Sequence, residues 1–475
     1  FYYYERYRMK RFVGYLVLFS TIAFTSCDKL NVYDKKDAKL KFSSSIITFD
    51  TIFTSVSSIT KRLVVYNPYS GDINTDIYLL GDNNSYFSLN INGVAARKLT
   101  DVEIPAKDSI FIFVKVIINP NQQNTPMLLT DTIRFFTNGN TQNVELLAYG
   151  QDANFIVPNR SLGNLSYFIV AGEGEEVTWT KEKPYVIYGY AVVDSVGKLN
   201  IEAGTKIYVH KKGGLWIYKG GCLHVNGTQD EPVVFQGDRL EDFFQDDYEQ
   251  WDRIWINEGS QDNIINYAVI KNAFIGIQAE ILDKDMGNKL ILTNSIIKKS
   301  AGMGFLAKNY TVEAYNNIIA NCGQHCIALT QGGTYTFIHN TIYNAYSLGT
   351  RATPSVFFSN YYIVNNVMYL SDFHCDFINN IVWGTNKREF NCDYDKSALF
   401  QANISHCAFK SDTSFPTYFT SMLLNKDPLF EKVADYDFQL QAASPCKGAG
   451  KSSTGVLFDI KGNSRNAPPS IGAYE

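Results

Sequence analysis

The densest group of chemically capable side chains lies between Gly237 and Trp255, in the segment GDRLEDFFQDDYEQWDRIW. It contains two tryptophans, Trp251 and Trp255, and seven carboxylates: Asp238, Glu241, Asp242, Asp246, Asp247, Glu249 and Asp252. Carboxylate oxygens are preferred ligands of Ca²⁺, and they also accept hydrogen bonds from hydroxyl groups, while indole faces stack on sugar rings.

Loops on a rigid scaffold commonly carry binding sites. The segment therefore predicts a ligand-contacting loop whose candidate residues are Asp246, Asp247, Trp251, Asp252 and Trp255. Ca²⁺ is the one cofactor that such a loop could hold, and no other cofactor is expected. The competing interpretation is a solvated loop that the two tryptophans dock onto the scaffold by turning inward.

Two further groups of residues invite a chemical interpretation. Three His-Cys pairs occur, at His325-Cys326, His374-Cys375 and His406-Cys407. Neighbours in a strand face opposite sides, so inward cysteines would leave outward histidines, and a column of these could bind zinc or copper. We favour the alternative that the pairs lie on separate faces and form no metal site.

Asp459 and Arg465 near the C-terminus are expected to form a structural ion pair, and we assign no catalytic residue.

The composition indicates an all-β protein of more than one domain. A chain of 475 residues suggests two or three domains. Tyr (31) and Phe (32) are abundant and Pro (13) is scarce, and beyond the first 26 residues no long stretch has helical periodicity. The formal net charge of −4 gives no reason to expect a nucleic-acid partner.

Internal repeats predict a solenoid. Four segments share an Asn-x-Ile core, with asparagines at 294, 316, 340 and 379: LTNSIIKKS, AYNNIIANC, FIHNTIYNA and FINNIVWGT. The alternation within each repeat and its length of about 20–30 residues favour a parallel β-helix, in which like residues stack. We therefore expect Asn to stack on Asn at a turn, and Ile296, Ile318 and Ile381 to point into the coil.

Two longer segments resemble known β-helix proteins. LNIEAGTKIYVHKKGGLWIYKGGCLHVNGTQDEPVVFQGDR (199–239) resembles the opening coils of right-handed, pectate-lyase-like β-helices. SPCKGAGKSSTGVLFDIKGNSRNAPPSIGAYE (444–475) resembles the closing segment of secreted bacterial β-helix proteins, including those called choice-of-anchor Q. The resemblance implies a right-handed parallel β-helix. Neither the closely spaced Asp motifs of polygalacturonases nor the calcium site and basic residue of pectate lyases are found.

The segment before the solenoid predicts a β-sandwich. Seven candidate strands alternate with turn signals from about Leu40 to Gly150. They are Ile47–Thr54, Lys61–Asn67, Ile77–Leu80, Phe87–Ile91, Ser109–Ile118, Thr132–Thr137 and Val144–Tyr149. The order ITFDTIF, LVVYNP, IPAKDSIFIFVKV, DTIRFFTN, VELLAYGQ resembles immunoglobulin-like domains of the abnormal-spindle and major-sperm-protein group. We expect the sandwich at 40–151, a linker or cap at 152–184 and the β-helix at 185–475.

The first residues indicate export. We take Met9 as the start, after upstream residues 1–8, with Lys10 and Arg11 before the apolar run FVGYLVLFSTIAF. The run ends in Phe24-Thr25-Ser26-Cys27, in which a small residue directly precedes Cys27, and this resembles the lipidation site of bacterial, Bacteroidetes-like lipoproteins. Residues 1–27 would then be upstream residues and signal peptide, with 28–39 a tether, and the lipid would be the only contact with the membrane. The seven other cysteines, an odd number, are expected to be buried apolar side chains.

Taken together, these features predict an exported lipoprotein of the bacterial cell envelope, at the outer membrane. We expect it to be a non-catalytic binding or scaffold module that contacts a polysaccharide or an envelope protein along its β-helix. The alternative is a polysaccharide lyase or glycoside hydrolase on the same fold, because the fold alone does not assign an activity.

Overall fold

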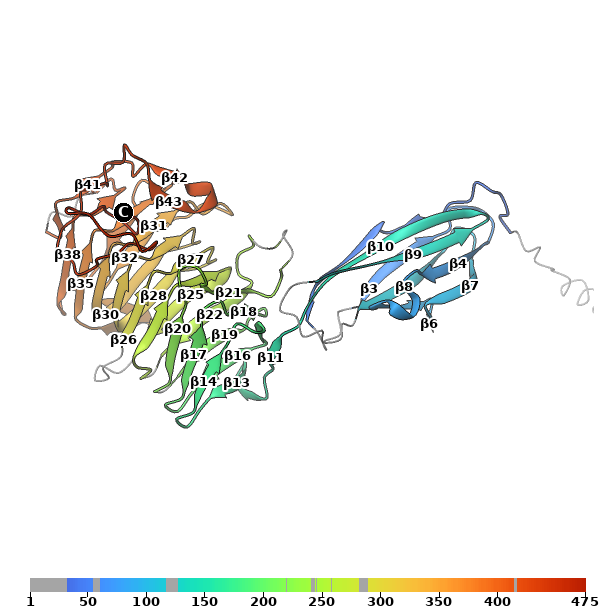
Figure 1. The fold of residues 1–475 in the computed structure, drawn as a ribbon, viewed down its shortest axis with the longest axis horizontal. Coiled ribbons are helices and arrows are strands. Elements are labelled where there is room, and N and C mark those ends of the chain that lie inside the picture. Colours follow the sequence, from blue (N-terminus) through green and yellow to red (C-terminus); the bar gives the residue numbers. More distant parts are fainter. Residues whose placement is uncertain are drawn as a thin grey trace, which may run out of the picture. The chain divides into compact units, whose positions relative to one another are not determined.

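The computed structural model describes residues 32–53, 60–116, 127–218, 220–240, 244, 246–257, 259–281, 289–413 and 417–475. Cys27 lies outside these ranges. The chain divides into two compact units close to residue 148, and both are built from strands (Figure 1). In the ranges above, the helices are single 3₁₀ turns such as η1 (Asp82–Asn84) and η3 (Val433–Asp435), and none is long and apolar enough to cross a membrane. The prediction of an all-β fold is confirmed.

The first unit is a sandwich of two antiparallel sheets. In hydrogen-bonded order, one sheet contains β1 (Lys41–Phe42), β3 (Lys61–Tyr66), β8 (Ser109–Val116), β5 (Phe87–Ile91) and β6 (Val94–Ala95). The other contains β2 (Ile46–Phe53), β10 (Asn140–Gln151), β9 (Met127–Thr137), β4 (Ile73–Leu79) and β7 (Lys98–Ile104). Each of the seven expected strands is present. The expectation missed the two-residue strands β1 and β6 and also β7. In β7 only Val102 and Ile104 are buried, so that its alternation is weak.

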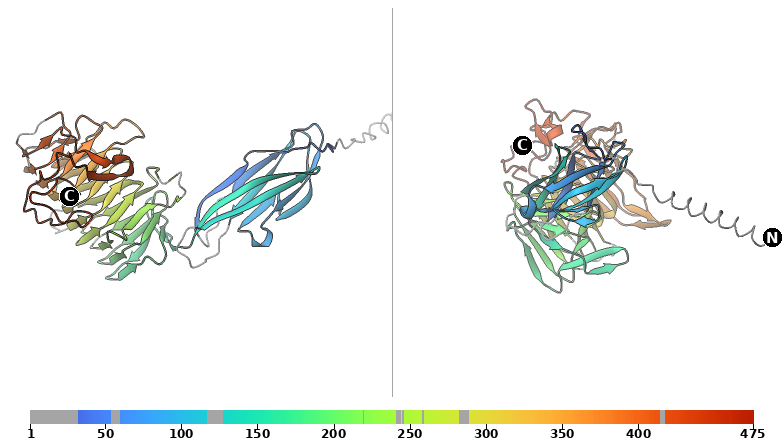
Figure 2. Two further views of the ribbon diagram at one scale, coloured as in Figure 1. Left: turned by 45° about the horizontal axis from the view of Figure 1, so that its top comes forward. Right: turned by 90° about the vertical axis from the view of Figure 1, so that its right-hand side faces the viewer.

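The second unit is a parallel β-helix whose strands lie on three faces (Figures 1 and 2). One face is a separate sheet, which we call the closing face: β11 (Asn154–Ile156), β15 (Tyr185–Ile187), β18 (Lys206–Val209), β21 (Val233–Gly237), β24 (Ala268–Lys271), β27 (Ile296–Lys298), β29 (Ile318–Ala320), β31 (Thr341–Asn344), β36 (Ile381–Gly384), β39 (Ala408–Phe409) and β41 (Leu423–Leu424).

The two other faces belong to one larger sheet, because β28 (Phe305–Tyr315) and β30 (Ile327–Ile338) run through both. The groove face contains β13 (Leu165–Ala171), β16 (Tyr190–Val193), β19 (Gly214–Ile217), β22 (Trp251–Ile256), β25 (Ala273–Glu280), β32 (Val356–Phe358) and β37 (Phe390–Cys392). The third face contains β14 (Glu176–Trp179), β17 (Lys198–Glu202), β20 (Cys222–Asn226), β23 (Asn263–Asn266), β26 (Lys289–Thr293), β35 (Phe373–Ile378), β38 (Phe400–Ser405) and β40 (Phe419–Thr420). Strand β12 (Arg160–Leu162) pairs with β13 at the start, and β42 (Phe430–Lys432) pairs with β43 (Asp437–Leu440) near the end.

Residues 152–184, which we expected to be a linker or cap, carry the first strands of the coil. Strand β11 pairs in parallel with β15, β13 with β16, and β14 with β17. The β-helix therefore begins earlier than residue 185.

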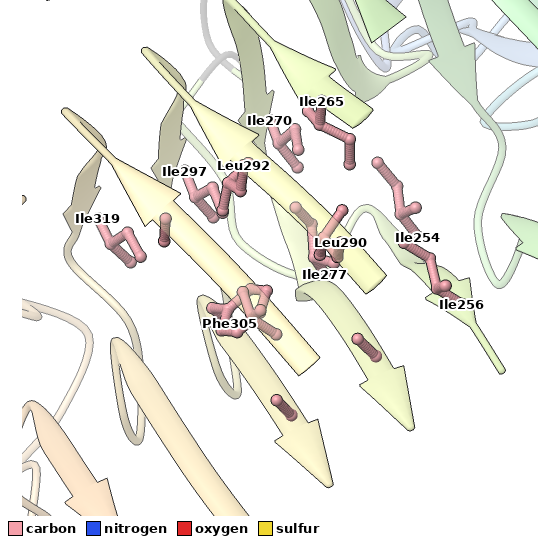
Figure 3. Close-up of a cluster of buried hydrophobic side chains, with 14 of the residues drawn as sticks. Ile254, Ile256, Ile265, Ile270, Ile277, Leu290, Leu292, Ile297, Phe305 and Ile319 are labelled. Atoms are coloured by element: carbon pink, nitrogen blue, oxygen red, sulfur yellow. The ribbon is translucent and has the colours of Figure 1, made fainter. Parts of the chain in front are cut away.

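Stacked apolar side chains fill the interior (Figure 3). On the closing face the inward ladder runs Ile270, Ile297, Ile319, Ile342 and Val382, each in register with the next. Each side chain is at most 1% exposed. Because strands in a sheet lie about 4.8 Å apart, each rung packs directly on its neighbours.

Asparagines form two ladders at the corner before the closing face, where one had been expected. The outer ladder has backbone with positive φ at Asn294, Asn316, His339 and Asn379. The inner ladder contains Ser295, Asn317, Asn340 and Asn380, all fully buried. The expected alignment of Asn340 with Asn316 was thus wrong by one residue, because His339 takes the outer position in that coil.

The expectation that Ile296, Ile318 and Ile381 point into the coil was also wrong. They occupy the outward side of the closing face, one residue before the inward ladder. Ile318 and Ile381 are nevertheless buried, because the C-terminal segment covers them with Cys446, Ile460, Ile471 and Ala473. The adjacent pairs Ile318-Ile319 and Ile381-Val382 therefore each contribute to two different cores.

Arg465 has the expected structural role but a different partner. Its guanidinium contacts the Glu475 carboxylate at 3.6 Å and donates to Asn316 Oδ1 at 2.7 Å. Asp459 instead accepts hydrogen bonds from the backbone N–H groups of Lys461, Asn463 and Glu475. Both residues hold the last turns against the coil.

Candidate functional site

The acidic segment 238–255 does not form one loop. Its last part, from Trp251, is strand β22 of the groove face. Glu241 and Asp242 lie outside the described residues. Asp238 pairs with His210, with 2.6 Å between Oδ2 and Nδ1, and this hydrogen bond raises the pKa of the imidazole. The five candidate residues therefore separate into two groups.

The first group docks the segment onto the coil. Trp251 is 1% exposed within the interior cluster, and its Nε1 donates to the carbonyl oxygen of Lys271 at 2.9 Å. Asp246 forms an ion pair with Lys299, and the carbonyl oxygen of Asp247 accepts a bond from Asn272 Nδ2 at 2.6 Å. For Trp251 the competing interpretation, an inward docking side chain, is correct.

The second group, Asp252 and Trp255, lies on the outward side of the groove face. Trp255 stacks on Trp216 of the preceding coil, with ring centroids 5.0 Å apart and planes 15° from parallel. Tyr190 and Tyr218 also contact Trp216, which is held in place by a 2.8 Å bond from its Nε1 to Asn257 Oδ1. The outward positions of three successive coils thus carry an aromatic strip.

Polar side chains continue the strip on the next coils. Trp255 Nε1 donates to Glu280 Oε1 at 2.7 Å, and Gln278 Nε2 donates to Glu280 Oε2 at 2.8 Å. Lys308 lies 3.2 Å from the same carboxylate. Glu280 is therefore fixed by an indole, an amide and an ammonium group.

A second polar network lies on the preceding strands. Arg253 Nη2 donates to Asp252 Oδ1 at 2.8 Å, and another guanidinium nitrogen donates to Gln278 Oε1. The Tyr190 hydroxyl donates to Asp252, and burial followed by the Asp252 charge raises the pKa of that hydroxyl. Gln278 joins this network to Glu280.

A β-hairpin borders Glu280 and Lys308 on one side. Strands β33 (Tyr361–Val364) and β34 (Val367–Leu370) are joined by Asn365 and Asn366, both with positive φ. Tyr362, Val364 and Tyr369 of the hairpin line a pocket of about 200 Å³. The other lining residues are Glu280, Ile281, Lys308 and Gln331. The Lys308 ammonium lies 4.6 Å from the centroid of the Tyr362 ring.

We call this region the aromatic groove and define it by Trp216, Trp255, Gln278, Glu280, Lys308 and Tyr362. The pocket itself includes Glu280, Lys308 and Tyr362, and Trp255 borders it through its bond to Glu280. Trp216 and Gln278 are buried, at 6% and 5% exposed. Sequence reasoning found Trp255 and the adjacent Asp252 but missed the other members of the groove. The hairpin had a local signal, since Asn-Asn between two apolar runs is typical of a tight turn with positive φ at both central residues. The contacts of Glu280 had no local signal in the sequence, because they depend on the register between coils.

The three His-Cys pairs do not form a column. Cys326, Cys375 and Cys407 are buried in the interior, as the pattern required. Their histidines, however, lie at different places: His325 at the corner before β30, His374 in β35, and His406 at the corner after β38. In the described part of the chain, no three His, Cys, Asp or Glu side chains are placed to hold a metal ion, so the Ca²⁺ expectation has no ligand set there.

The cysteines within the described ranges are all free thiols, and five of the seven are buried.

A larger pocket of about 560 Å³ lies between Tyr267, Asn294 and Tyr315 on the coil and Leu457 and Phe458 of the C-terminal segment. One of its amides, Asn316, already bonds to Phe458 and Arg465. We therefore assign this hollow to the joint that closes the coil.

Comparison with known proteins supports the class of the second unit. A sequence model of the family described as pectate-lyase like beta helix domain matches residues 172–251. The chain thus contains a pectate-lyase-like β-helix domain, and the match ends at the first residue of β22. No curated protein matches the chain.

Solved structures give distant likenesses. The catalytic unit of a thermostable GH87 alpha-1,3-glucanase from Streptomyces thermodiastaticus strain HF3-3 is 14% identical, with 73% of each chain covered and a TM-score of 0.30. The ASH/PapD-like domain 7 of human CEP192 is 8% identical, covering 26% of this chain and 89% of that one, with a TM-score of 0.18. A protein of unknown function from Porphyromonas gingivalis W83 is 11% identical, covering 30% of this chain and 59% of that one, with a TM-score of 0.19. Such scores carry no argument about activity.

Proposed function

We propose that this chain is an exported lipoprotein of the bacterial cell envelope that binds a glycan, without cleaving it, in the aromatic groove. The observation that carries the proposal is the stacked pair Trp216 and Trp255, which borders a carboxylate fixed by Gln278 and Lys308. Trp216 is only 6% exposed, so the indole available to the apolar C–H face of a sugar ring is that of the part-exposed Trp255. Glu280 and Lys308 are the polar side chains that can bond to sugar hydroxyl groups. The groove supplies both on a rigid sheet.

The polar contacts support binding over cleavage. Asp252 accepts bonds from Arg253 and Tyr190, and Glu280 accepts bonds from Trp255, Gln278 and Lys308. A glycosidase needs one carboxylic acid that carries a proton for the leaving group. Hydrogen-bond donors around a carboxylate favour its ionised form. Asp252 and Glu280 are therefore better suited to accept hydrogen bonds from sugar hydroxyl groups than to deliver a proton.

A polysaccharide lyase or glycoside hydrolase is the second candidate. Two carboxylates on adjacent strands of one face, Asp252 and Glu280, favour it, together with the basic groups of Arg253 and Lys308. These are the residue types that either chemistry employs. These residues lie on β22, β25 and β28, so this candidate would use the same groove.

A glycan array probed with the chain from residue 28 onward separates the candidates. The proposal expects retention of one class of glycan and recovery of that glycan at unchanged length after prolonged incubation, as measured by mass spectrometry. Shortened or unsaturated products would establish the enzyme instead. Retention of no glycan by a folded protein would contradict both.

The anchor is tested separately. Replacing Cys27 with Ala should give an exported protein that incorporates no labelled fatty acid and leaves the detergent phase, because two or three acyl chains are needed for stable anchoring. Acyl labelling that persists in Cys27→Ala would contradict the lipoprotein proposal.

A further inference from the structure

Three lysines meet where the acidic segment docks on the closing face. Lys271 of β24 and Lys298 of β27 are in register on adjacent strands, and Lys299 follows at the corner. The ammonium groups of Lys298 and Lys299 lie 4.0 Å and 5.9 Å from the centroid of one ring, that of Tyr436. Three positive charges therefore share one partly covered place.

Asp246 is the described carboxylate that acts on all three lysines. It forms an ion pair with Lys299, and its charge also influences Lys271 and Lys298. The Asp246 side chain is 83% exposed and that of Lys299 only 13%, so the carboxylate reaches the cluster from the solvent side. Three ammonium groups and one carboxylate leave a formal charge of +2.

The three ammonium groups repel one another, and a bound anion would offset this repulsion. Burial, followed by repulsion from Lys271 and Lys299, lowers the pKa of Lys298 to about 8. Burial likewise lowers the pKa of Lys271. Like charges in a partly desolvated place disfavour each other, whereas an opposite charge within a few ångströms favours them. The neighbouring Tyr436 and Tyr248 offer rings and hydroxyl groups but no negative charge at neutral pH.

We propose that Lys271, Lys298 and Lys299 form a binding site for a divalent oxyanion, a phosphate or sulfate group, with Asp246 as a tethered carboxylate at its open side. The charge of the ligand follows from the +2 that Asp246 leaves uncompensated. The site is distinct from the aromatic groove, which lies on another face of the coil. The acidic segment then contributes to binding by limiting access, since its carboxylate competes with the ligand.

Isothermal titration of the whole chain at pH 7 and constant ionic strength tests the site. The probes are inorganic phosphate, inorganic sulfate and glucose 6-phosphate, so that a free ion and an esterified group are distinguished. We expect saturable binding of at least one probe, weakened about tenfold or more in Lys271→Met/Lys298→Met. Lys206→Met, which removes an exposed lysine from the same face, should bind like the parent. No saturable binding, or equal binding by the double variant, would overturn the proposal.

Asp246→Asn gives an independent result that does not require the double variant to fold. Removing the carboxylate raises the formal charge of the cluster to +3, so anion binding should tighten, by up to about fivefold for one partly exposed charge pair. A structural ion pair that only docks the segment predicts the opposite, namely binding that is unchanged or weaker. That outcome would overturn the proposal.

Discussion

Ile318 and Ile319 are neighbours in β29, and they are buried in two different cores. Ile319 packs in the interior of the coil, whereas Ile318 packs under the C-terminal segment with Cys446, Ile471 and Ala473. Successive side chains in a strand face opposite sides of the sheet. The closing face is therefore covered on both sides at this coil, which explains why the repeat carries two adjacent isoleucines and not one.

This arrangement predicts different local effects from two similar substitutions. Ile318→Ala and Ile319→Ala should each lower the free energy of unfolding by about 2–5 kcal/mol, the usual cost of a large-to-small change in a core. Only Ile318→Ala should speed amide exchange selectively in residues 444–475, because its cavity lies under that segment. Hydrogen exchange followed by mass spectrometry measures this, and equal protection of the segment in both variants would refute the two-core arrangement.

The inner asparagine ladder should contribute strongly to stability. Asn340 Oδ1 accepts bonds from the backbone N–H and the side-chain amide of Asn317, at 2.9 Å and 3.0 Å. Asn340→Ala leaves the buried Asn317 backbone N–H without an acceptor and leaves the Asn317 side-chain amide with the Leu292 carbonyl oxygen alone. The substitution should cost at least about 2 kcal/mol in urea unfolding. Asn403→Ala removes an exposed amide and should change stability by no more than about 0.5 kcal/mol. Equal effects would mean that the ladder contributes nothing special.

The fold could be predicted from the sequence because alternation and repeats report which residues are buried. Register was harder: the sequence comparison aligned Asn340 with Asn316, although strand pairing places it beside Asn317. A shift of one residue exchanges the two sides of a strand, and this is why Ile296, Ile318 and Ile381 were assigned to the wrong core. The repeat length alone does not contain this information.

The candidate site was predictable only in part, for a related reason. Trp255 and Asp252 could be found because acids and tryptophans cluster locally in the sequence. Trp216 lies 39 residues before Trp255 in the sequence, and Glu280 lies 25 residues after it. Both come next to Trp255 only through the stacking of coils. Trp251 looked equivalent to Trp255, but the two have opposite orientations in β22.

A buried ion pair gives a third prediction. Arg351 and Glu389 form a 2.7 Å contact with side chains 1% and 0% exposed, and Glu389 also accepts a bond from the Ser355 hydroxyl. Breaking one partner leaves an uncompensated buried charge, so Glu389→Gln should lower stability by about 3–5 kcal/mol. The exposed pair Lys181 and Glu231 is the control, and Glu231→Gln should cost no more than about 1 kcal/mol. Thermal unfolding that does not distinguish the two variants would contradict this account.

His339 should make stability depend on pH. Burial and the nearby Arg465 charge lower its pKa to about 3, whereas an unfolded histidine has a pKa near 6.5. Between these two pH values the unfolded chain binds a proton at this histidine and the folded chain does not. The free energy of unfolding therefore falls as the pH decreases from about 6.5 towards 3, by up to about 1.4 kcal/mol per pH unit.

His339→Asn is the matched variant for this test. Asparagine occupies the same positive-φ position in the neighbouring coils, at Asn316 and Asn379. Urea unfolding between pH 4 and 7 should show a shallower loss of stability at low pH for His339→Asn than for the parent protein. Parallel profiles would show that His339 does not titrate in this way.

The central proposal, glycan binding in the aromatic groove, is tested most directly by the affinity of Trp255→Ala for whichever glycan the parent protein binds. Trp383→Ala serves as control, because it removes a partly buried tryptophan from the closing face. With folding verified by thermal unfolding, we expect Trp255→Ala to weaken binding by about tenfold or more and Trp383→Ala to leave it unchanged. Equal affinities of the parent protein and Trp255→Ala would contradict the assignment of the groove as the binding site.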